Sequence, residues 1–481
     1  MKKLTRLRER WSDRRVETPT PKLFELEAAE AKASYDHDTG LHDTELRVAL
    51  CKRCQDLQIG TDLEQRCEVR YGTIATITIP SLDSHCNLCQ QFRAVFNIAN
   101  DSSTQLLLRS EFDLSRQAFT ILDERGTYYG QYLCIHLQHS RQDIRLLPAH
   151  GLFKKDYPSR SETIHPLGNF INPTLPDLEL ARQWLRTCRE SHASSCMTSS
   201  PQTNLLRLID CRSRQLVEAT HDQRYICLSY VWGCDAAEEP TAQAALPDIV
   251  PKTVEDAMFV AINLDIPFLW VDRYCIDQDN VQEKHSIIRN MDRIYQGAEV
   301  TIIASVGDDP HHGLPGVRGT PRQPQYRLQG DVCTYVAAEE VAKEIKASKW
   351  NSRGWTYQEM LLSRRRLVFP KSQMYSQCTV SHEIESLFPR MTSGPFKNVY
   401  RVFPPYGIGQ STEDLKLRLC EYYRRQLSYE ADIVDAFAGI VNAFQDTGFD
   451  SDTLTQFYGV LAYYNKDDTD KVRISFLIGL F

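Results

Sequence analysis

The sequence predicts an α/β fold whose core is a parallel sheet, with a β-rich unit before it and a helical region after it. Three observations support this prediction. Apolar runs of strand length occupy 225–231, 267–272 and 299–305, and segments with helical periodicity separate them. The runs are almost continuously apolar, as is typical of parallel strands buried on both faces. Strand–helix–strand order at this spacing favours right-handed βαβ units and a doubly wound sheet.

The core is expected at 201–385. Helices follow the first two strands, and the second helix begins after Asn280, whose spacing to Glu283 is that of an N-cap and the third helical residue. The run RRLVF at 365–369 predicts a fourth strand.

The segments outside the core differ in composition. Residues 1–45 are charged and turn-rich, which predicts a poorly ordered tail. Residues 46–150 contain short strand-like runs and predict an N-terminal β-rich unit. Residues 151–200 have the composition of a linker and then place apolar side chains at helical spacing along 176–190. Within 386–481, residues 412–446 carry apolar side chains at helical spacing, which predicts a C-terminal helical region.

Composition and charge exclude several classes of protein. The 481 residues carry a net charge of −7, which gives no electrostatic reason to expect a nucleic acid or an anionic membrane as partner. No window approaches about 18 consecutive apolar residues, so no membrane span is predicted. The basic start lacks the apolar stretch of a secretory signal. The 15 cysteines, an odd number, favour reduced thiols and a cytoplasmic location over a disulfide framework.

Polar and aromatic side chains follow the first two strands, where a ligand site is expected. In an open α/β sheet, ligands bind outside the carboxyl ends of the strands. Candidate substrate-binding residues at these ends are Ser229, Tyr230, Trp232, Asp272 and Cys275. Alternatively, Tyr230 and Trp232 are core aromatics and Asp272 caps a turn. A hydrolase that uses Ser229 or Cys275 as nucleophile is disfavoured, because no partner base and no nucleophile elbow are evident.

A third set of candidate site residues lies in the segment RGWTYQEMLLSRRRLVF at 353–369. If the start of this segment is helical, Trp355 and Glu359 are one turn apart and share a face. Arg353 and Trp355 are candidate binding residues, and Glu359 places a carboxyl group beside Trp355. The alternative is that Glu359 forms an ion pair with one of the arginines at 364–366 and stabilises a helix end.

Three blocks of this region resemble, in wording and order, the heterokaryon incompatibility (HET) domain of filamentous fungi: YICLSYVWG at 225–233, LWVDRYCIDQ at 269–278 and the segment 353–369. The resemblance covers roughly 200–385. It implies nonself recognition and programmed cell death, with self-association through the domain and an activating protein partner that the sequence does not identify. HET domains are similar to Toll/interleukin-1 receptor (TIR) domains, which implies a TIR-like or flavodoxin-like parallel sheet.

The TIR resemblance also implies a reaction. Many TIR domains carry a Trp followed four positions later by a Glu, which is catalytic in members that cleave NAD. Trp355 and Glu359 match this spacing, so the resemblance implies Glu359 as the candidate catalytic residue. Breaking the nicotinamide–ribose bond develops positive charge on the ribose, which a carboxylate stabilises. No glycine-rich dinucleotide fingerprint is present, so an NAD site here would be of the TIR kind, with NAD as substrate. The alternative function is a non-catalytic signalling module that acts by self-association or partner binding.

Two cysteine pairs lie in the N-terminal β-rich unit. Cys51 and Cys54 form one C-x-x-C knuckle, and Cys86 and Cys89 form another. Four thiolates from two such knuckles are a tetrahedral ligand set for a structural Zn²⁺, which would contribute folding free energy to a small β unit. The alternative is a set of reduced, buried cysteines at turns.

A second pattern, formed by Cys188, His192 and Cys196, follows the apolar stripe of the helix predicted at 176–190. One-turn spacing directs such side chains to the same side. A zinc ion needs a fourth ligand, which the sequence does not identify. The alternative is a helix C-terminus at which His192 interacts with the last carbonyl groups.

Overall fold

The computed structural model describes most of the core with side chains, and the backbone of further strands outside it. Side chains are described within 51–56, 82–86, 89–90, 168–197, 206–220, 222–233, 245–325, 341–387, 401–404 and 407–446. The backbone alone is described for the strands within 71–164, 327–337 and 454–476. The tail predicted at 1–45 lies outside the described residues.

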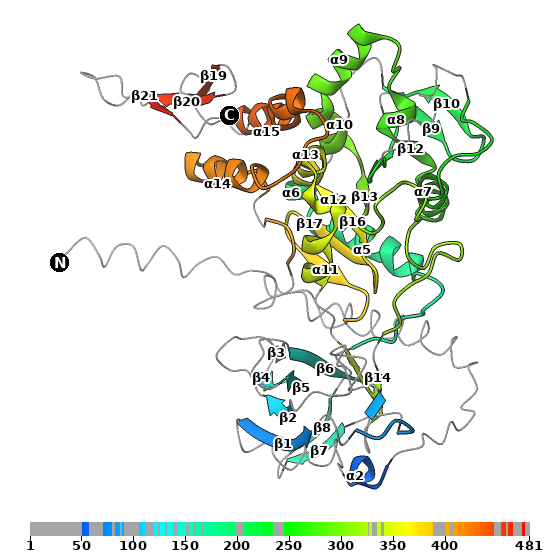
Figure 1. The fold of residues 1–481 in the computed structure, drawn as a ribbon, viewed down its shortest axis with the longest axis vertical. Helices are drawn as coiled ribbons and strands as arrows, with labels where there is room; N and C mark the ends of the chain where they lie inside the picture. Colours follow the sequence, from blue (N-terminus) through cyan, green and yellow to red (C-terminus); the bar gives the residue numbers. More distant parts are fainter. Residues whose placement is uncertain are drawn as a thin grey trace, which may run out of the picture. The chain divides into compact units, whose positions relative to one another are not determined.

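The core is an eight-stranded mixed sheet in the order β10–β9–β12–β11–β13–β16–β17–β18 (Figure 1). Its four central strands are parallel neighbours: β12 (Phe268–Trp270), β11 (Ile226–Ser229), β13 (Val300–Ala304) and β16 (Arg365–Phe369). The three apolar runs and RRLVF are therefore adjacent parallel strands. This arrangement confirms the predicted α/β class.

Short antiparallel hairpins extend this parallel centre at both edges. β9 (Arg207–Asp210) pairs with β12 and β10 (Gln215–Glu218), and β17 (Tyr375–Cys378) pairs with β16 and β18 (His382–Ile384). The sequence pattern does not predict these strands, because runs of three or four residues are too short to show a period.

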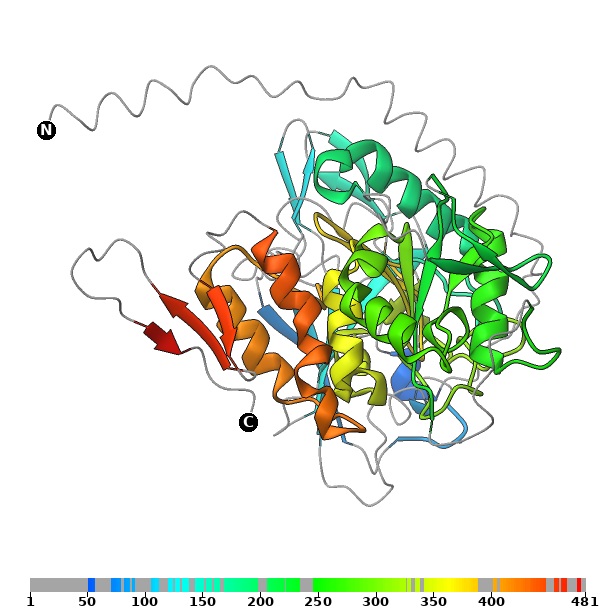
Figure 2. The same cartoon turned by 90° about the horizontal axis from the view of Figure 1, so that it is seen from above.

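Helices cover both faces of the sheet (Figure 2). Because neighbouring strand residues point to opposite faces, Ile302 and Ile303 of β13 enter different hydrophobic cores. The core around Ile302 includes residues of α5 (Leu178–Ser191) and α7 (Lys252–Asn263). The core around Ile303 includes residues of α11 (Val341–Ala347), α13 (Gly354–Leu362), α14 (Thr412–Tyr422) and α15 (Asp435–Gln445).

Side chains that accept hydrogen bonds from first-turn amides mark where two of the helices begin. α5 begins after Asp177, whose carboxylate accepts from the amide of Leu180 at 2.9 Å. α9 (Val281–Arg289) begins after Asn280, whose side chain accepts from the amide of Glu283 at 3.2 Å. The cap predicted from Asn280 and Glu283 is therefore present, and it directs α9 and the following α10 (Met291–Gly297) back toward the sheet.

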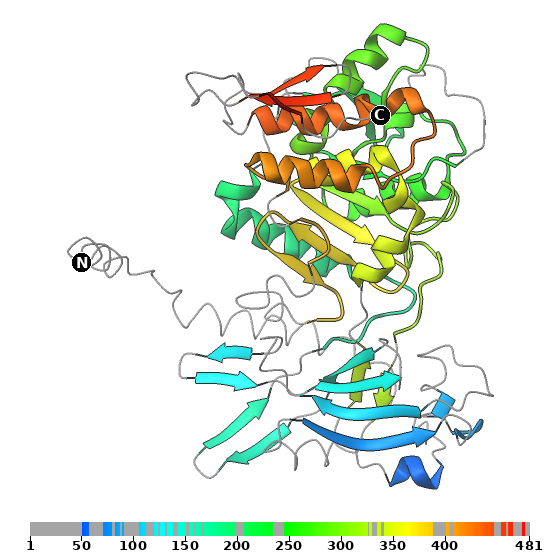
Figure 3. The same cartoon turned by 60° about the vertical axis from the view of Figure 1, so that its left-hand side comes forward.

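A second sheet has six antiparallel strands in the order β1–β2–β5–β6–β15–β14 (Figure 3). Its strands are β1 (Tyr71–Thr78), β2 (Gln105–Glu111), β5 (Tyr132–Leu137), β6 (Asp143–His150), β14 (Arg327–Gln329) and β15 (Thr334–Ala337). Because β15 pairs with β6, a segment from 327–337 completes a sheet otherwise formed by 71–150. Two hairpins also occur before the core: β3 (Thr120–Asp123) with β4 (Gly126–Tyr129), and β7 (Phe153–Tyr157) with β8 (Arg160–Ile164).

The C-terminal region contains α14, the 3-10 helix η5 (Glu430–Ile433) and α15, and α14 and α15 lie side by side (Figures 1 and 2). A capping box between Ser411 and Asp414 starts α14. Three strands also occur here, which the sequence does not predict: β19 (Leu454–Phe457), β20 (Val460–Tyr464) and β21 (Ile474–Phe476). Among the described residues, no helix has the length and apolar character that crossing a membrane requires.

Candidate functional site

The candidate site lies at the carboxyl ends of β11 and β12. Ser229 is the last residue of β11, and Asp272 follows β12 as the first residue of the short helix α8 (Asp272–Cys275). Glu359 comes from α13 and Tyr295 from α10. The Tyr295 hydroxyl lies close enough to Glu359 to influence the pKa of its carboxyl group. The fold thus brings two carboxyl groups and two hydroxyl groups together at the edge where α/β sheets bind ligands.

Indole groups position the polar side chains at the ends of both strands. Trp350, from α12 (Lys349–Ser352), donates from Nε1 to Ser229 Oγ at 2.7 Å, and both groups are buried. Trp232 donates from Nε1 toward both carboxylate oxygens of Asp272, each at 3.1 Å. The Arg273 guanidinium lies over the Trp232 ring, 6.0 Å from its centroid. Trp232 therefore orients the Asp272 carboxylate in addition to packing against the core.

The two carboxyl groups of the site are protonated differently. Burial, reinforced by the negative charge of Asp272, raises the pKa of Glu359 to about 8. Polar contacts from Ser229 and Tyr295 act in the opposite direction. Burial also raises the pKa of Asp272, to about 6, against the hydrogen bonds that it accepts. Because two neighbouring like charges disfavour each other, the pair holds one proton near neutral pH, mainly on Glu359.

Cationic and aromatic groups surround this acid pair. Arg353 acts on both carboxyl groups as a positive charge, and it is half-buried, as are Trp232 and Arg273. Tyr230 is buried, and its hydroxyl has no hydrogen-bond partner among the described residues. Since a buried hydroxyl without a partner costs roughly 1–3 kcal/mol, a polar atom of a bound ligand would be stabilised beside Tyr230.

Glu359 does not form the alternative ion pairs with the arginines that follow it. Arg365 donates to the carbonyl oxygen of Glu299 at 3.1 Å. Arg366 donates to the carbonyl oxygens of Met360 and Leu361 at 2.6 and 3.3 Å. Within the described part of the chain, the Glu359 carboxyl group therefore forms no ion pair with the arginines at 364–366, and the alternative of such a pair at the helix end is wrong.

Two other candidates have partners of their own. Trp355 lies on α13 one turn before Glu359, and its Nε1 donates to Asp432 Oδ2 of η5 at 2.9 Å. The Cys275 sulfur accepts from the amide of Val271 at 3.3 Å, and burial raises the pKa of the Cys275 thiol to about 12. Because the protonated thiol is a poor nucleophile, Cys275 is unsuited to covalent catalysis. Binding roles for Trp355 and Cys275 stay predictions.

The sequence pattern did not single out Tyr295 or Trp350. Tyr295 is part of an apolar helical stripe, and only the fold directs it toward Glu359. Trp350 precedes the third block by three residues. The available signal was chemical, since a buried indole N–H usually finds a hydrogen-bond acceptor.

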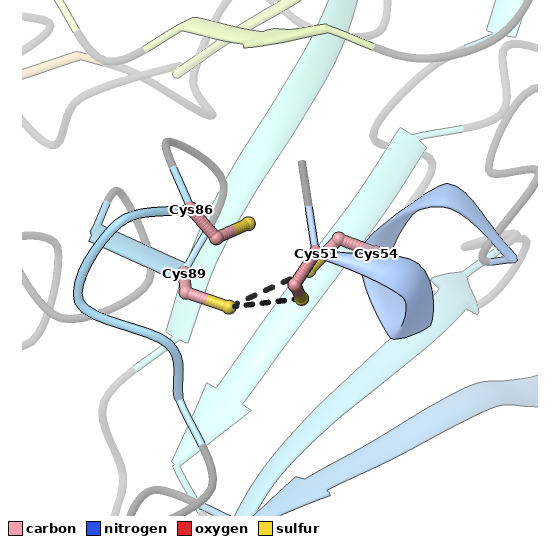
Figure 4. A group of neighbouring side chains, drawn as sticks. All are labelled: Cys51, Cys54, Cys86 and Cys89. Atoms are coloured by element: carbon pink, nitrogen blue, oxygen red, sulfur yellow. Dashed lines mark hydrogen bonds between the residues drawn. The ribbon is translucent and has the colours of Figure 1, made fainter. Parts of the chain in front are cut away.

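The two C-x-x-C knuckles converge near α2 (Lys52–Gln55) (Figure 4). The Sγ atoms of the four predicted zinc ligands all lie within 4.8 Å of one another: Cys51, Cys54, Cys86 and Cys89. Cys89 Sγ is 3.9 Å from Cys51 Sγ and 3.5 Å from Cys54 Sγ. Tetrahedral zinc with bonds of about 2.3 Å requires sulfurs about 3.8 Å apart. The four cysteines therefore have a spacing compatible with one zinc ion.

Comparison with known proteins identifies the domain that contains the acid pair. Residues 225–359 match the family model of the heterokaryon incompatibility protein (HET). No curated protein and no solved structure matches the chain. The chain therefore carries a HET domain, as the three sequence blocks implied, and this domain suggests a function related to heterokaryon incompatibility. Similarity to TIR domains stays a prediction from the sequence.

Proposed function

We propose that this protein is an effector of nonself recognition and programmed cell death, and that its acid pair cleaves the nicotinamide–ribose bond of NAD. Activation would follow self-association of the HET domain under the control of a protein partner. One observation carries the catalytic part of the proposal. The buried Glu359 and the half-buried Asp272 lie together at the ligand-binding edge of a parallel sheet, with pKa values of about 8 and about 6. Perturbed carboxyl pairs of this kind concentrate at catalytic sites.

The surroundings of the pair match the chemistry of NAD. Arginine forms bidentate hydrogen bonds with phosphate groups, so the half-buried Arg273 and Arg353 suit the diphosphate. The half-buried ring of Trp232 suits stacking on a base. The nicotinamide ring of NAD is a cation, which the single negative charge shared by Asp272 and Glu359 would attract.

The proposed reaction is a hydrolysis. The bond between C1′ of the ribose and the ring nitrogen breaks, and its electron pair stays with nicotinamide, which leaves as a neutral molecule. The single negative charge that the acid pair shares stabilises the positive charge that develops on the ribose, and Glu359 carries this charge when the shared proton is on Asp272. A water oxygen then adds to C1′, and its proton passes to the acid pair. The products are nicotinamide, ADP-ribose and one proton.

The test is to express the full chain in a fungal host and to measure cellular NAD and cell death together. Glu359→Gln keeps the shape of the side chain but cannot ionise. The matched control is Glu344→Gln on α11, because Glu344 accepts from Ser372 Oγ at 2.6 Å and lies outside the site. The proposal predicts loss of NAD with the wild type and with the control, and constant NAD with Glu359→Gln.

Two results would reject NAD cleavage by Glu359. The first is loss of NAD that persists unchanged in Glu359→Gln. The second is cell death with the wild type while NAD stays constant, which would favour the non-catalytic module that signals by self-association. In that case, surface substitutions that prevent self-association should abolish cell death while the acid pair is intact.

We also propose that Cys51, Cys54, Cys86 and Cys89 bind one structural zinc ion. Their sulfurs converge, and Arg53 Nη2 lies 3.2 Å from Cys89 Sγ, where it would offset the charge of a thiolate. Four protein ligands fill a tetrahedral ion and leave no position for a substrate. The cytoplasmic location expected from the cysteine content would keep these thiols reduced.

Removal of this zinc should destabilise the N-terminal β-rich unit before the HET domain. The measurement is amide hydrogen exchange of the full chain after Cys54→Ser, with Cys420→Ser as a control from outside the group. Faster exchange in strands β1, β2 and β5, with little change in β11 and β13, is the expected result. Equal exchange in the Cys54→Ser and Cys420→Ser variants would contradict a zinc ion at the knuckles.

A further inference from the structure

We propose a second structural zinc site, formed by Cys188, His192, Cys196 and Cys378. This inference is independent of the proposed function and of the first cysteine group. The ligand atoms of these four residues all lie within 4.8 Å of one another. Three cysteines and one histidine are a common ligand set for structural zinc.

Three of the ligands come from one helical path. α5 ends at Ser191, and α6 (Ala193–Cys196) continues directly after His192. The amide of His192 donates to the carbonyl oxygen of Cys188 at 3.0 Å, and the amide of Cys196 donates to that of His192 at 2.9 Å. These one-turn steps place the three side chains on the same side, as the C-x3-H-x3-C spacing predicted.

The fourth ligand, which the sequence could not identify, is Cys378 at the end of β17. Its Sγ lies 3.6 Å from Nδ1 of His192. α5 packs against β17, and this contact brings the last strand residue to the helical ligands. Cys378 is separated from Cys196 by 378 − 196 = 182 positions, so only the tertiary fold brings the two together.

The surroundings of the sulfurs provide a second, independent observation. The amides of Val380 and Ser381 point at Cys378 Sγ, at 3.4 and 3.1 Å. Arg365 Nε points at Cys188 Sγ at 3.1 Å. Donors directed at sulfur stabilise thiolates, which are the form that binds metal. Arg365 would also offset the net negative charge of three thiolates around Zn²⁺.

Ordinary buried thiols explain this arrangement less well. Cys188, Cys196 and Cys378 are 6%, 0% and 5% exposed and form a buried group separate from the two hydrophobic cores. Hydrophobic cysteines would be expected to mix with the aliphatic core, and Arg365 would not be expected to donate to one of them. A shared metal ion accounts for the convergence, the donors and the separation from the cores.

The site would connect the two flanks of the HET domain. Cys188, His192 and Cys196 precede the matched segment 225–359, and Cys378 follows it. All four tetrahedral positions would be occupied by protein, so the ion is structural and has no open position for catalysis. Its removal should loosen α5 and α6 from β17 first.

The test is the zinc content of the purified, reduced full chain. Wild type should contain two zinc ions per chain, Cys378→Ser and Cys54→Ser one each, and the double variant none, whereas Cys420→Ser should keep both. If only the first cysteine group fails to bind metal, wild type contains one ion and Cys378→Ser contains none. The two sites can therefore be judged separately.

A variant that keeps a metal ligand distinguishes loss of the zinc ligand from loss of zinc through misfolding. Cys378→His preserves a ligand, so this variant should keep the zinc that Cys378→Ser loses. Replacement of zinc by Co²⁺ should give thiolate-to-metal absorption that Cys378→Ser weakens. The proposal is overturned if the folded Cys378→Ser protein retains as much zinc as wild type. It is also overturned if the wild type holds a disulfide between Cys188 and Cys378 in place of metal.

Discussion

Two buried carboxyl groups in this protein have opposite surroundings. Glu385, next to β18, accepts hydrogen bonds from both terminal nitrogens of Arg322 and from the amide of Met374, the latter at 2.7 Å. Glu359 instead faces a second carboxyl group, that of Asp272. Glu385 and Arg322 are both buried and satisfy each other, whereas the charges of Glu359 and Asp272 repel.

The difference separates a structural carboxylate from a candidate catalytic one. The Arg322–Glu385 pair connects the proline- and glycine-rich loop at 313–325 to the edge of the sheet, and its charges cancel. The Glu359–Asp272 pair costs stability when both groups ionise. Local costs of this kind are expected at functional sites, and the HET domain provides the biological context for one.

Breaking the satisfied pair should have the largest effect on stability. Glu385→Ala leaves the Arg322 guanidinium buried without a carboxylate, since Arg322 is 1% exposed on its side chain. Loss of one partner of a buried pair typically costs about 3–5 kcal/mol. Urea unfolding of the full chain measures this free energy. A loss of unfolding free energy below about 1 kcal/mol is typical of exposed ion pairs. Such a loss would show that Arg322 and Glu385 do not differ from the acid pair as a source of stability.

Replacing Glu359 by a side chain that cannot ionise should instead increase the free energy of unfolding. The pKa of Glu359 rises from an ordinary value of 4.5 to about 8 on folding. Its contribution to stability is therefore complete below pH 4.5 and is lost as pH rises through about 8. Glu359→Gln cannot ionise, so it should gain stability relative to wild type between those values, on the order of a few kcal/mol. Unfolding free energies at several pH values test this; a difference independent of pH would contradict it.

A smaller effect isolates the coupling between the two carboxyl groups. The negative charge of Asp272 contributes to the raised pKa of Glu359, so Asp272→Asn should lower that pKa, by roughly one pH unit. Infrared titration of the Glu359 carbonyl band, identified by its loss in Glu359→Gln, measures the midpoint. Asp265→Asn is the control, because Asp265 is 75% exposed on its side chain. Equal midpoints in both variants would show that the pair is not coupled.

Much of the fold follows from local pattern, and the rest depends on contacts between distant segments. The parallel strands were predictable because runs such as 226–229 and 300–304 are apolar throughout. Asp272 was a candidate because it follows a strand, whereas Glu359 required the HET and TIR resemblance. Tyr295 could not be distinguished from a core residue, since its position in an apolar stripe gives no sign of what it faces.

The two cysteine groups show the same limit. The first could be predicted completely, because Cys51 with Cys54 and Cys86 with Cys89 each form a local knuckle. The second group was predicted only in part, because its last ligand lies on a short edge strand that has no period. Local spacing identifies ligands on one helix or turn, and only the fold identifies those that another element supplies.

NAD cleavage by the acid pair is tested most directly by measuring nicotinamide release from NAD incubated with the purified full chain. Loss of a positioned catalytic carboxylate typically lowers a rate by about 100-fold or more. We expect release by wild type and by Glu344→Gln, and a loss of at least that size in Glu359→Gln. Release by Glu359→Gln at the wild-type rate would show that the acid pair does not cleave NAD.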